Sequence, residues 1–268
     1  MKIGILGLGK MGEALVMGIR HSAETISWKL TATTRSKESA KKGGIALGIP
    51  VHSDNARLTT ESDVIILCVK PSQTESVLRE ISPLLTKKKL LISVAASITT
   101  EEMEEWITHR CPVIRSMPNT PAIIREGMTV LSSGSDATDA HLKLAEKIFR
   151  LVGQTAIIEE KLMDGATGLS GCGPAYGYLI IEALSEAGVK VGLPRDKSIL
   201  LAAQTLLGAA KMVIERGVHP AALKDEVTTP AGCTIDGLMA LEEGRLRVTL
   251  IKAVLAATAK SEKLRAER

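Results

Sequence analysis

The chain has 268 residues, enough for one large or two modest domains whose core needs no disulfide bonds. It carries 34 Lys and Arg against 30 Asp and Glu, a net charge of only +4, and 2% aromatic residues, so we expect no nucleic-acid-binding surface. Its four cysteines lie far apart with no C-x-x-C pair, which argues against a metal site or a disulfide framework and favours a reducing compartment.

Short aliphatic runs alternate with helical patterns over residues 1–159. Runs of Val, Ile and Leu between helices favour a parallel sheet covered on both faces, an α/β fold. The predicted strands are Lys2–Leu6, Leu30–Thr34, Val64–Val69, Leu90–Val94, Val113–Arg115, Met128–Leu131 and Ala156–Ile158. The predicted helices are Gly12–Arg20, Lys37–Leu47, Thr74–Ile81, Glu101–Ile107 and Thr138–Leu151.

Residues 160–268 lose the strand pattern and divide into helix-length segments separated by Gly and Pro. Three prolines, Pro174, Pro194 and Pro220, stand where a helix can begin. The last segment is apolar around much of its circumference, and in a small all-α domain a second subunit is the expected cover. The predicted helices are Leu162–Leu169, Pro174–Ala187, Pro194–Glu215, Pro220–Val227, Ile235–Glu243 and Leu246–Lys263.

The chain opens on a strand without a signal-peptide pattern, and no uncharged apolar run reaches the roughly 20 residues of a membrane span. We therefore expect a soluble, cytoplasmic protein with no membrane partner.

The run Gly7-Leu8-Gly9-Lys10-Met11-Gly12 has the G-x-G-x-x-G spacing directly between a strand and a helix. Such glycines permit a tight turn, a close approach of the backbone to a pyrophosphate and tight packing of the helix on the strand. This context predicts a dinucleotide site; a glycine turn without a ligand is the alternative. The second strand ends in Thr33-Thr34-Arg35-Ser36 with no carboxylate, which favours NADP(H) over NAD(H).

Other strand ends fall at the expected ligand crevice. Lys70 in Cys68-Val69-Lys70-Pro71 faces either a ribose or solvent, and the small side chains of Ala95-Ala96-Ser97 leave room for a nicotinamide ring. In the second half, Thr228–Ile235 runs into a helix and presents amides suited to a carboxylate, although an ordinary helix cap fits as well. The histidines suggest no general base, so a hydride transfer that needs little acid–base help fits best.

Together these motifs resemble one family, the Δ1-pyrroline-5-carboxylate reductases. The C-terminal signature is the most specific part, and the resemblance extends in order over essentially the whole chain. The matching runs are Val69–Pro71, Val113–Pro121, Leu169–Tyr176, Ala187–Pro194, Ala202–Met212, Thr228–Leu238, Leu241–Gly244, Leu250–Val254 and Lys260–Leu264.

The resemblance implies a fold and a reaction. Residues 1–159 would form an NADP-binding Rossmann domain and residues 160–268 an all-α substrate-binding and dimerisation domain. The family reduces the cyclic imine Δ1-pyrroline-5-carboxylate to L-proline, the last step of proline biosynthesis, here with NADPH preferred and NADH possible. Family members form homodimers, and five dimers commonly assemble into a decamer.

The resemblance also implies residue roles. For the pyrophosphate these are Gly7, Gly9, Lys10, Met11 and Gly12, and for the 2′-phosphate Thr34, Arg35 and Ser36. Asn55 would contact the adenosine ribose. The nicotinamide ribose would lie against Val69, Lys70 and Pro71, and the nicotinamide ring against Ala95 and Ala96. For the substrate they are Glu160, Thr229, Gly232, Cys233 and Thr234, with Thr234 as the catalytic residue that positions the imine nitrogen.

Three positions depart from the family pattern. Ser97 replaces a Gly beside the predicted nicotinamide site, Cys172 replaces a Ser, and Glu226 replaces an amide. They leave two other readings open: a non-catalytic NADP(H)-binding paralogue, and a reductase of a different cyclic imine. A 3-hydroxy-acid reductase is disfavoured because no lysine stands out as its acid–base group.

Overall fold

The structure, a computed structural model, describes residues 1–267 in two compact units. The sheet unit contains Met1–Cys172 together with the end of the chain from Ala256, and the helical unit contains Gly173–Leu255. This division differs from the expected boundary at residue 160. The short helical segments between Glu160 and Gly171 contact β6 (Val113–Pro118) and β7 (Gly127–Ser133), so the compact unit formed by the sheet extends past residue 160.

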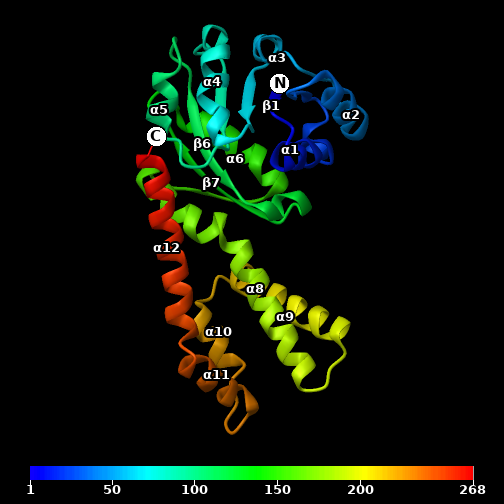
Figure 1. Ribbon diagram of the computed structural model, residues 1–268, viewed down its shortest axis with the longest axis vertical. Helices are drawn as coiled ribbons and strands as arrows, with labels where there is room; N and C mark the ends of the chain where they lie inside the picture. Colours follow the sequence, from blue (N-terminus) through cyan, green and yellow to red (C-terminus); the bar gives the residue numbers. More distant parts are fainter. Residues whose placement is uncertain (268) are drawn as a thin grey trace. The chain divides into compact units, whose positions relative to one another are not determined.

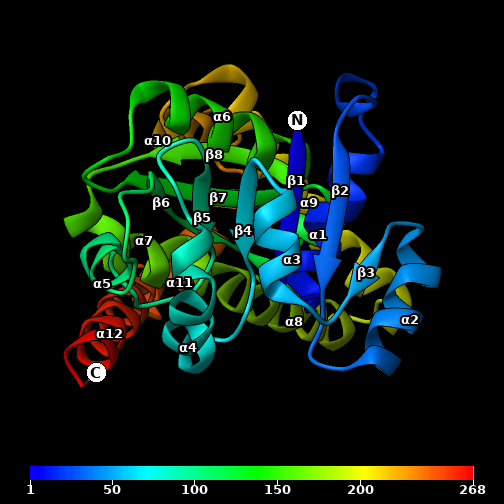
Figure 2. The same cartoon turned by 90° about the horizontal axis from the view of Figure 1, so that it is seen from above.

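The sheet has eight strands in the order β3-β2-β1-β4-β5-β6-β7-β8. Figure 2 shows β2, β1, β4 and β5 side by side. All neighbours pair in parallel except β6 and β7, which are antiparallel because the connection between them is too short for a crossover. The strands are β1 (Lys2–Leu6), β2 (Lys29–Thr33), β3 (Val51–His52), β4 (Val64–Leu67), β5 (Leu90–Ser93), β6 (Val113–Pro118), β7 (Gly127–Ser133) and β8 (Gly153–Ile157).

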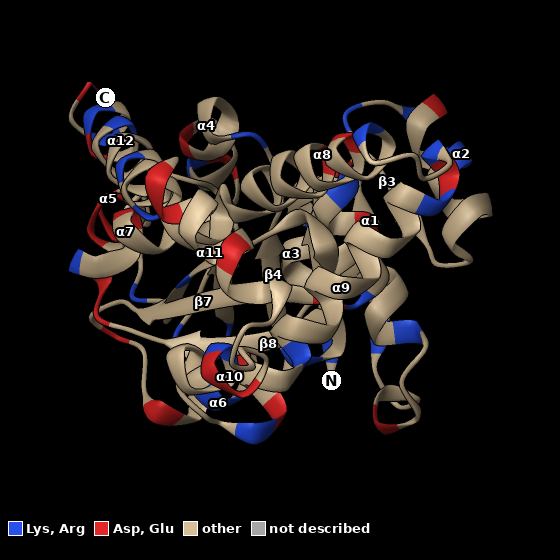
Figure 3. Cartoon of the chain, turned by 90° about the horizontal axis from the view of Figure 1, so that it is seen from below, with Lys and Arg blue, Asp and Glu red and all other residues tan. Residues whose placement is uncertain are grey.

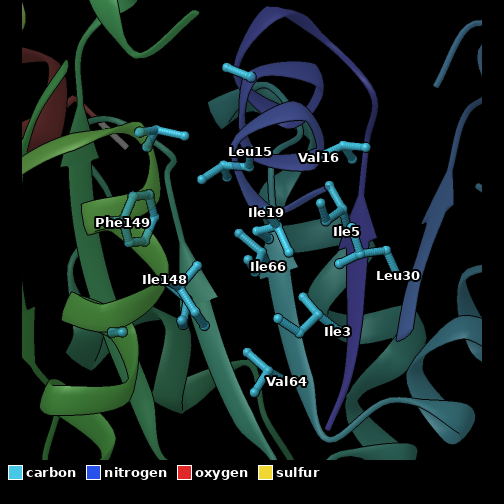
Figure 4. Close-up of a cluster of buried hydrophobic side chains, with 14 of the residues drawn as sticks. Ile3, Ile5, Leu15, Val16, Ile19, Leu30, Val64, Ile66, Ile148 and Phe149 are labelled. Atoms are coloured by element: carbon cyan, nitrogen blue, oxygen red, sulfur yellow. The ribbon is translucent and has the colours of Figure 1, made fainter. Parts of the chain in front are cut away.

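Helices cover both faces of the sheet, as predicted, and each face has its own core. Alternate residues of β4 point to opposite faces, so Ile66 joins the core under α1 and α6 while Ile65 joins the core under α3, α4 and α5. Figure 4 shows the first core, with Ile66 between Ile19 and Ile148. The helices are α1 (Lys10–Arg20), α2 (Lys37–Leu47), α3 (Asn55–Glu61), α4 (Pro71–Ile81), α5 (Thr100–Glu105), α6 (Asp139–Phe149) and α7 (Met163–Ala166).

Sequence patterning missed two short elements, β3 and α3. A two-residue strand has no detectable period, and α3 follows it at once. The helix does have a start signal, since the side chain of Asp54 accepts a hydrogen bond from the Arg57 amide at 2.9 Å. The capping signal at Thr99 and Glu102 is confirmed as a full capping box at the start of α5.

The helical unit contains α8 (Gly173–Lys190), α9 (Arg195–Arg216), α10 (Pro220–Glu226), α11 (Cys233–Glu243) and the first half of α12 (Leu246–Ala266). The predicted helix starts at the three prolines are confirmed. Helices α8 and α9 pack so closely at Gly188 that a Cβ there would lie only 2.7 Å from Ser198 Oγ.

Many apolar side chains of the helical unit are uncovered. Leu179, Leu200 and Leu255 are 65%, 61% and 62% exposed, and residues 198–210 of α9 carry no charge, as the long tan stretch of that helix illustrates (Figure 3). By length and composition alone, α9 is the one helix in the described part of the chain that could cross a bilayer. An apolar surface of this extent requires a cover.

Candidate dinucleotide and substrate sites

A cavity of about 540 Å³ opens at the carboxyl ends of β1, β2 and β4. The strand order runs outward in opposite directions from β1 and β4, so this is the switch point where parallel sheets bind ligands. Seven predicted cofactor residues line the cavity: Gly7, Gly9, Thr34, Arg35, Asn55, Val69 and Lys70. The other seven lie outside its lining: Lys10, Met11, Gly12, Ser36, Pro71, Ala95 and Ala96.

The glycine loop has the geometry that the sequence predicts. Gly7 has a φ of +95°, which favours glycine, and a Cβ at Gly12 would lie 2.5 Å from Gly7 O. A Cβ at Gly9 would meet no atom within 4 Å, so the backbone there is open to a ligand. Gly9 also caps α1 without a side-chain hydrogen bond, which leaves the first amides of the helix available to a pyrophosphate.

The end of β2 presents an exposed cation to the cavity. Arg35 is exposed and forms no ion pair with any residue of 1–267, so its guanidinium is available to a phosphate. Ser36 caps α2, because its hydroxyl accepts a hydrogen bond from the Ser39 amide at 3.2 Å. Ser36 thus shapes the helix start, while Thr34, Arg35 and Ser39 line the cavity.

Asn55, the first residue of α3, is held in the cavity wall by two side chains. Its Oδ1 accepts a hydrogen bond from Thr33 Oγ1 at 2.8 Å, and its Nδ2 donates to Glu80 Oε2 at 3.0 Å. These contacts fix the orientation of the amide.

The end of β4 contributes Cys68, Val69 and Lys70 to the cavity, and Pro71 begins α4. Burial raises the pKa of the Cys68 thiol to about 12, so the thiol is protonated at neutral pH and is not a nucleophile. The cation of Lys70 adds to the positive charge at this edge.

Ala95 and Ala96 follow β5, and Ser97 after them has a φ of +57°, which is unusual for a residue with a side chain. Ser97 is buried, and its hydroxyl lies 3.4 Å from Ser261 Oγ on α12. Its side chain is therefore directed to the end of α12.

Glu160 lies in a buried charged cluster of the sheet unit. One carboxylate oxygen accepts hydrogen bonds from the Thr100 amide at 2.8 Å and Arg115 Nη1 at 3.2 Å, and the other accepts from Thr100 Oγ1. Asp164 joins the cluster through Arg115, whose Nη2 lies 4.0 Å from its Oδ1, and it also accepts a hydrogen bond from Ser261 Oγ at 2.7 Å. Because both oxygens of Glu160 are engaged, its role toward a substrate stays a prediction.

The predicted substrate loop lies in the helical unit, where Gly232 caps α11 and Cys233 and Thr234 form its first turn. No side chain caps this helix start, and the Gly232 amide donates a hydrogen bond to Thr229 O at 3.0 Å, so the amides of Cys233 and Thr234 are the ones that could donate to a carboxylate. Gly232 lies so close to Thr229 that a Cβ at Gly232 would collide with the Thr229 hydroxyl. Ala231 between them has a φ of +56°.

Two of the three departures from the family pattern, Cys172 and Glu226, lie in the second half of the chain. Glu226 forms a bidentate pair with Arg216, at 2.6 and 3.0 Å, and the hydrogen bond from Arg216 lowers the pKa of the carboxyl group. Cys172 directly follows a π-helical turn, Thr167–Gly171, which overlaps the end of the predicted helix Leu162–Leu169.

Sequence analysis missed several residues that line the cavity. Gln73, Val77 and Glu80 recur at the spacing of one face of α4, a signal that was present in the sequence. Ser53 precedes the undetected α3. Residues 1–267 contain no cluster of three or more His, Cys, Asp or Glu side chains able to hold a metal ion.

Comparison with known proteins places these features in context. Residues 160–264 match the family model for pyrroline-5-carboxylate reductase dimerisation, and residues 2–97 match the model described as NADP oxidoreductase coenzyme F420-dependent. A pyrroline-5-carboxylate reductase of Pisum sativum is 43% identical over 98% of this chain and 95% of its own length.

Two solved structures are similar throughout. The pyrroline-5-carboxylate reductase of Coxiella burnetii is 35% identical with a TM-score of 0.91, covering 98% of this chain and 97% of that one. The pyrroline carboxylate reductase of Plasmodium falciparum, solved with NADP bound, is 37% identical with a TM-score of 0.85, covering 99% and 98%.

Proposed function

We propose the reaction of this chain from one premise: the chain belongs to the pyrroline-5-carboxylate reductase family. It reduces Δ1-pyrroline-5-carboxylate to L-proline by hydride transfer from a nicotinamide dinucleotide. The observation that carries this proposal is the similarity over the whole length of the chain, with both the glycine loop and the C-terminal signature intact.

NADPH is the proposed preferred cofactor, with NADH as a weaker substitute. The open backbone at Gly9 suits a pyrophosphate, and the free cation of Arg35 suits a 2′-phosphate, with no carboxylate at the end of β2 to hold a 2′-hydroxyl. When bound, this cofactor supplies the hydride. The remaining predicted residues, from Lys10 to Ala96, stay proposals for the same ligand.

The loop Thr229–Thr234 is proposed to hold the substrate. The amides of Cys233 and Thr234 at the start of α11 take the carboxylate beside Gly232, whose own amide donates to Thr229 O at 3.0 Å, and the Thr234 hydroxyl oxygen accepts a hydrogen bond from the N–H of the protonated imine. A threonine hydroxyl is a poor general acid, so Thr234 positions and polarises the nitrogen. A cyclic iminium accepts hydride readily, and the protein then needs chiefly to orient it and exclude water.

We propose a homodimer, assembled as a decamer of five dimers and located in the cytoplasm. Supporting this are the match to the dimerisation model and the uncovered apolar side chains of the helical unit, which a second copy of the chain would bury in place of lipid.

The deciding assay follows NADPH oxidation by purified protein with and without L-pyrroline-5-carboxylate, identifies proline as product, and repeats both with NADH. Substrate-dependent oxidation that is faster with NADPH supports the proposal. Tight NADPH binding with no turnover would overturn it in favour of a binding paralogue or another imine, and would direct attention to Ser97, Cys172 and Glu226.

A further inference from the structure

Among the described residues that line the dinucleotide cavity, Glu80 is the only acidic one. Arg35, Lys70 and the glycine loop all favour an anion, whereas Glu80 introduces a negative charge. A carboxylate cannot face the phosphates that these groups attract. Glu80 is exposed and is solvated without a ligand, but toward a ligand in this cavity it favours a neutral hydrogen-bond donor over a phosphate.

Glu80 comes from the cavity face of α4, which it shares with Gln73 and Val77. Its Oε2 accepts a hydrogen bond from Asn55 Nδ2 at 3.0 Å, and Asn55 is in turn fixed by Thr33. Within residues 1–267 this leaves Glu80 Oε1 without a partner. The carboxylate is thus oriented by the protein and retains one oxygen for a ligand.

The rest of the cavity limits which part of the ligand lies there. With the pyrophosphate at the glycine loop and a ribose phosphate at Arg35, the base of the same nucleoside would lie within the same cavity, which Val77 and Glu80 also line. The aliphatic side chain of Val77 beside Glu80 suits the flat face of a base. Adenine carries an amino group on C6, a neutral donor that matches a carboxylate.

We propose that Glu80 is a specificity-determining residue that accepts a hydrogen bond from the adenine amino group and selects adenine dinucleotides. This inference depends on the cofactor part of the proposed function and not on the substrate. The hypoxanthine analogue of NADPH provides a direct test, because it carries a carbonyl oxygen where adenine carries the amino group, and a carboxylate repels that oxygen.

The experiment measures dissociation constants of NADPH, NADH and hypoxanthine-NADPH by quenching of protein fluorescence, and kcat/KM where turnover occurs. In the unmodified protein we expect NADPH to bind at least about fivefold more tightly than its hypoxanthine analogue. In Glu80→Gln, whose amide can donate to the carbonyl, this preference should fall to near unity. A matched control is Glu75→Gln on the same helix, since Glu75 pairs with Arg79 at 2.9 Å and does not line the cavity.

Two results would overturn the inference. Equal weakening of NADPH and its analogue in Glu80→Gln would make Glu80 only a support for Asn55. A changed ratio of NADPH to NADH, with an unchanged base preference, would place Glu80 at the ribose. Binding of the cofactor needs no imine. A protein that fails to reduce pyrroline-5-carboxylate but still discriminates between the two bases would therefore disprove the proposed reaction and leave this inference intact.

Discussion

The sheet unit buries large apolar side chains in two cores, whereas the helical unit leaves many of its own exposed. In the sheet unit, Ile66 and Phe149 are fully buried within one chain. In the helical unit, Leu200 and Leu255 remain more than 60% exposed although the helices are well formed. A single copy of the chain therefore completes the core of the first unit and not that of the second, which needs another copy.

Substitution of a buried charge in the sheet unit should have the largest effect. Asp164 is 5% exposed, accepts a hydrogen bond from Ser261 and pairs with Arg265 Nη2 at 3.4 Å. Asp164→Asn leaves the cations of Arg115 and Arg265 undercompensated, so the free energy of unfolding should fall by about 3 kcal/mol, measured by urea denaturation. Asp196→Asn, in an exposed pair with Lys197, is the control that should change little. Equal losses in the two variants would show that burial of the charge is unimportant.

The apolar surface of the helical unit is tested at Leu255. Replacing it with Ser removes apolar area that a second copy would bury, and should weaken dimerisation by about 2 kcal/mol, measured by analytical ultracentrifugation across a dilution series. The control is Ile26→Ser in the sheet unit, because Ile26 is 85% exposed but lies outside the helical unit. If both variants dissociate alike, or neither does, the contrast between the units is wrong.

Thr234 tests the proposed substrate site of the helical unit. Thr234→Ala should lower kcat/KM for pyrroline-5-carboxylate at least about tenfold, roughly 1.4 kcal/mol of transition-state stabilisation, because the hydroxyl no longer meets the imine nitrogen. Thr249→Ala, whose hydroxyl only donates to Arg245 O at 3.1 Å, serves as the control in steady-state kinetics. Wild-type values in Thr234→Ala would remove this residue from the site.

The same contrast explains what the sequence could predict. Strands such as β1 and β4 are detectable because both of their faces are buried within one chain, and the glycine loop is detectable because its conformation is local. The antiparallel pairing of β6 with β7 follows from a short connection, residues 119–126, which appears longer in the sequence because the predicted strands end at Arg115 and begin at Met128. The spacing that places Glu80 on one face of α4 is visible in the sequence, but its contact with Asn55 is not, because that contact forms only after α3 and α4 have packed together. In the sequence, the only indication that the helical unit binds a second copy of the chain is its excess of apolar residues.

Arg35 offers the smallest and most selective effect, in the unit that is complete within one chain. Arg35→Ala removes an exposed cation, so the KM for NADPH should rise about fivefold, roughly 1 kcal/mol, while the KM for NADH stays nearly unchanged. The control is Arg57→Ala, since Arg57 pairs with Glu61 at 3.1 Å and does not line the cavity. Raising the salt concentration should narrow the difference between the two cofactors in the unmodified protein, because screening acts on the 2′-phosphate and not on a hydroxyl. Equal effects of Arg35→Ala on both cofactors would refute the phosphate role and leave the glycine loop as the only supported anion site in this unit.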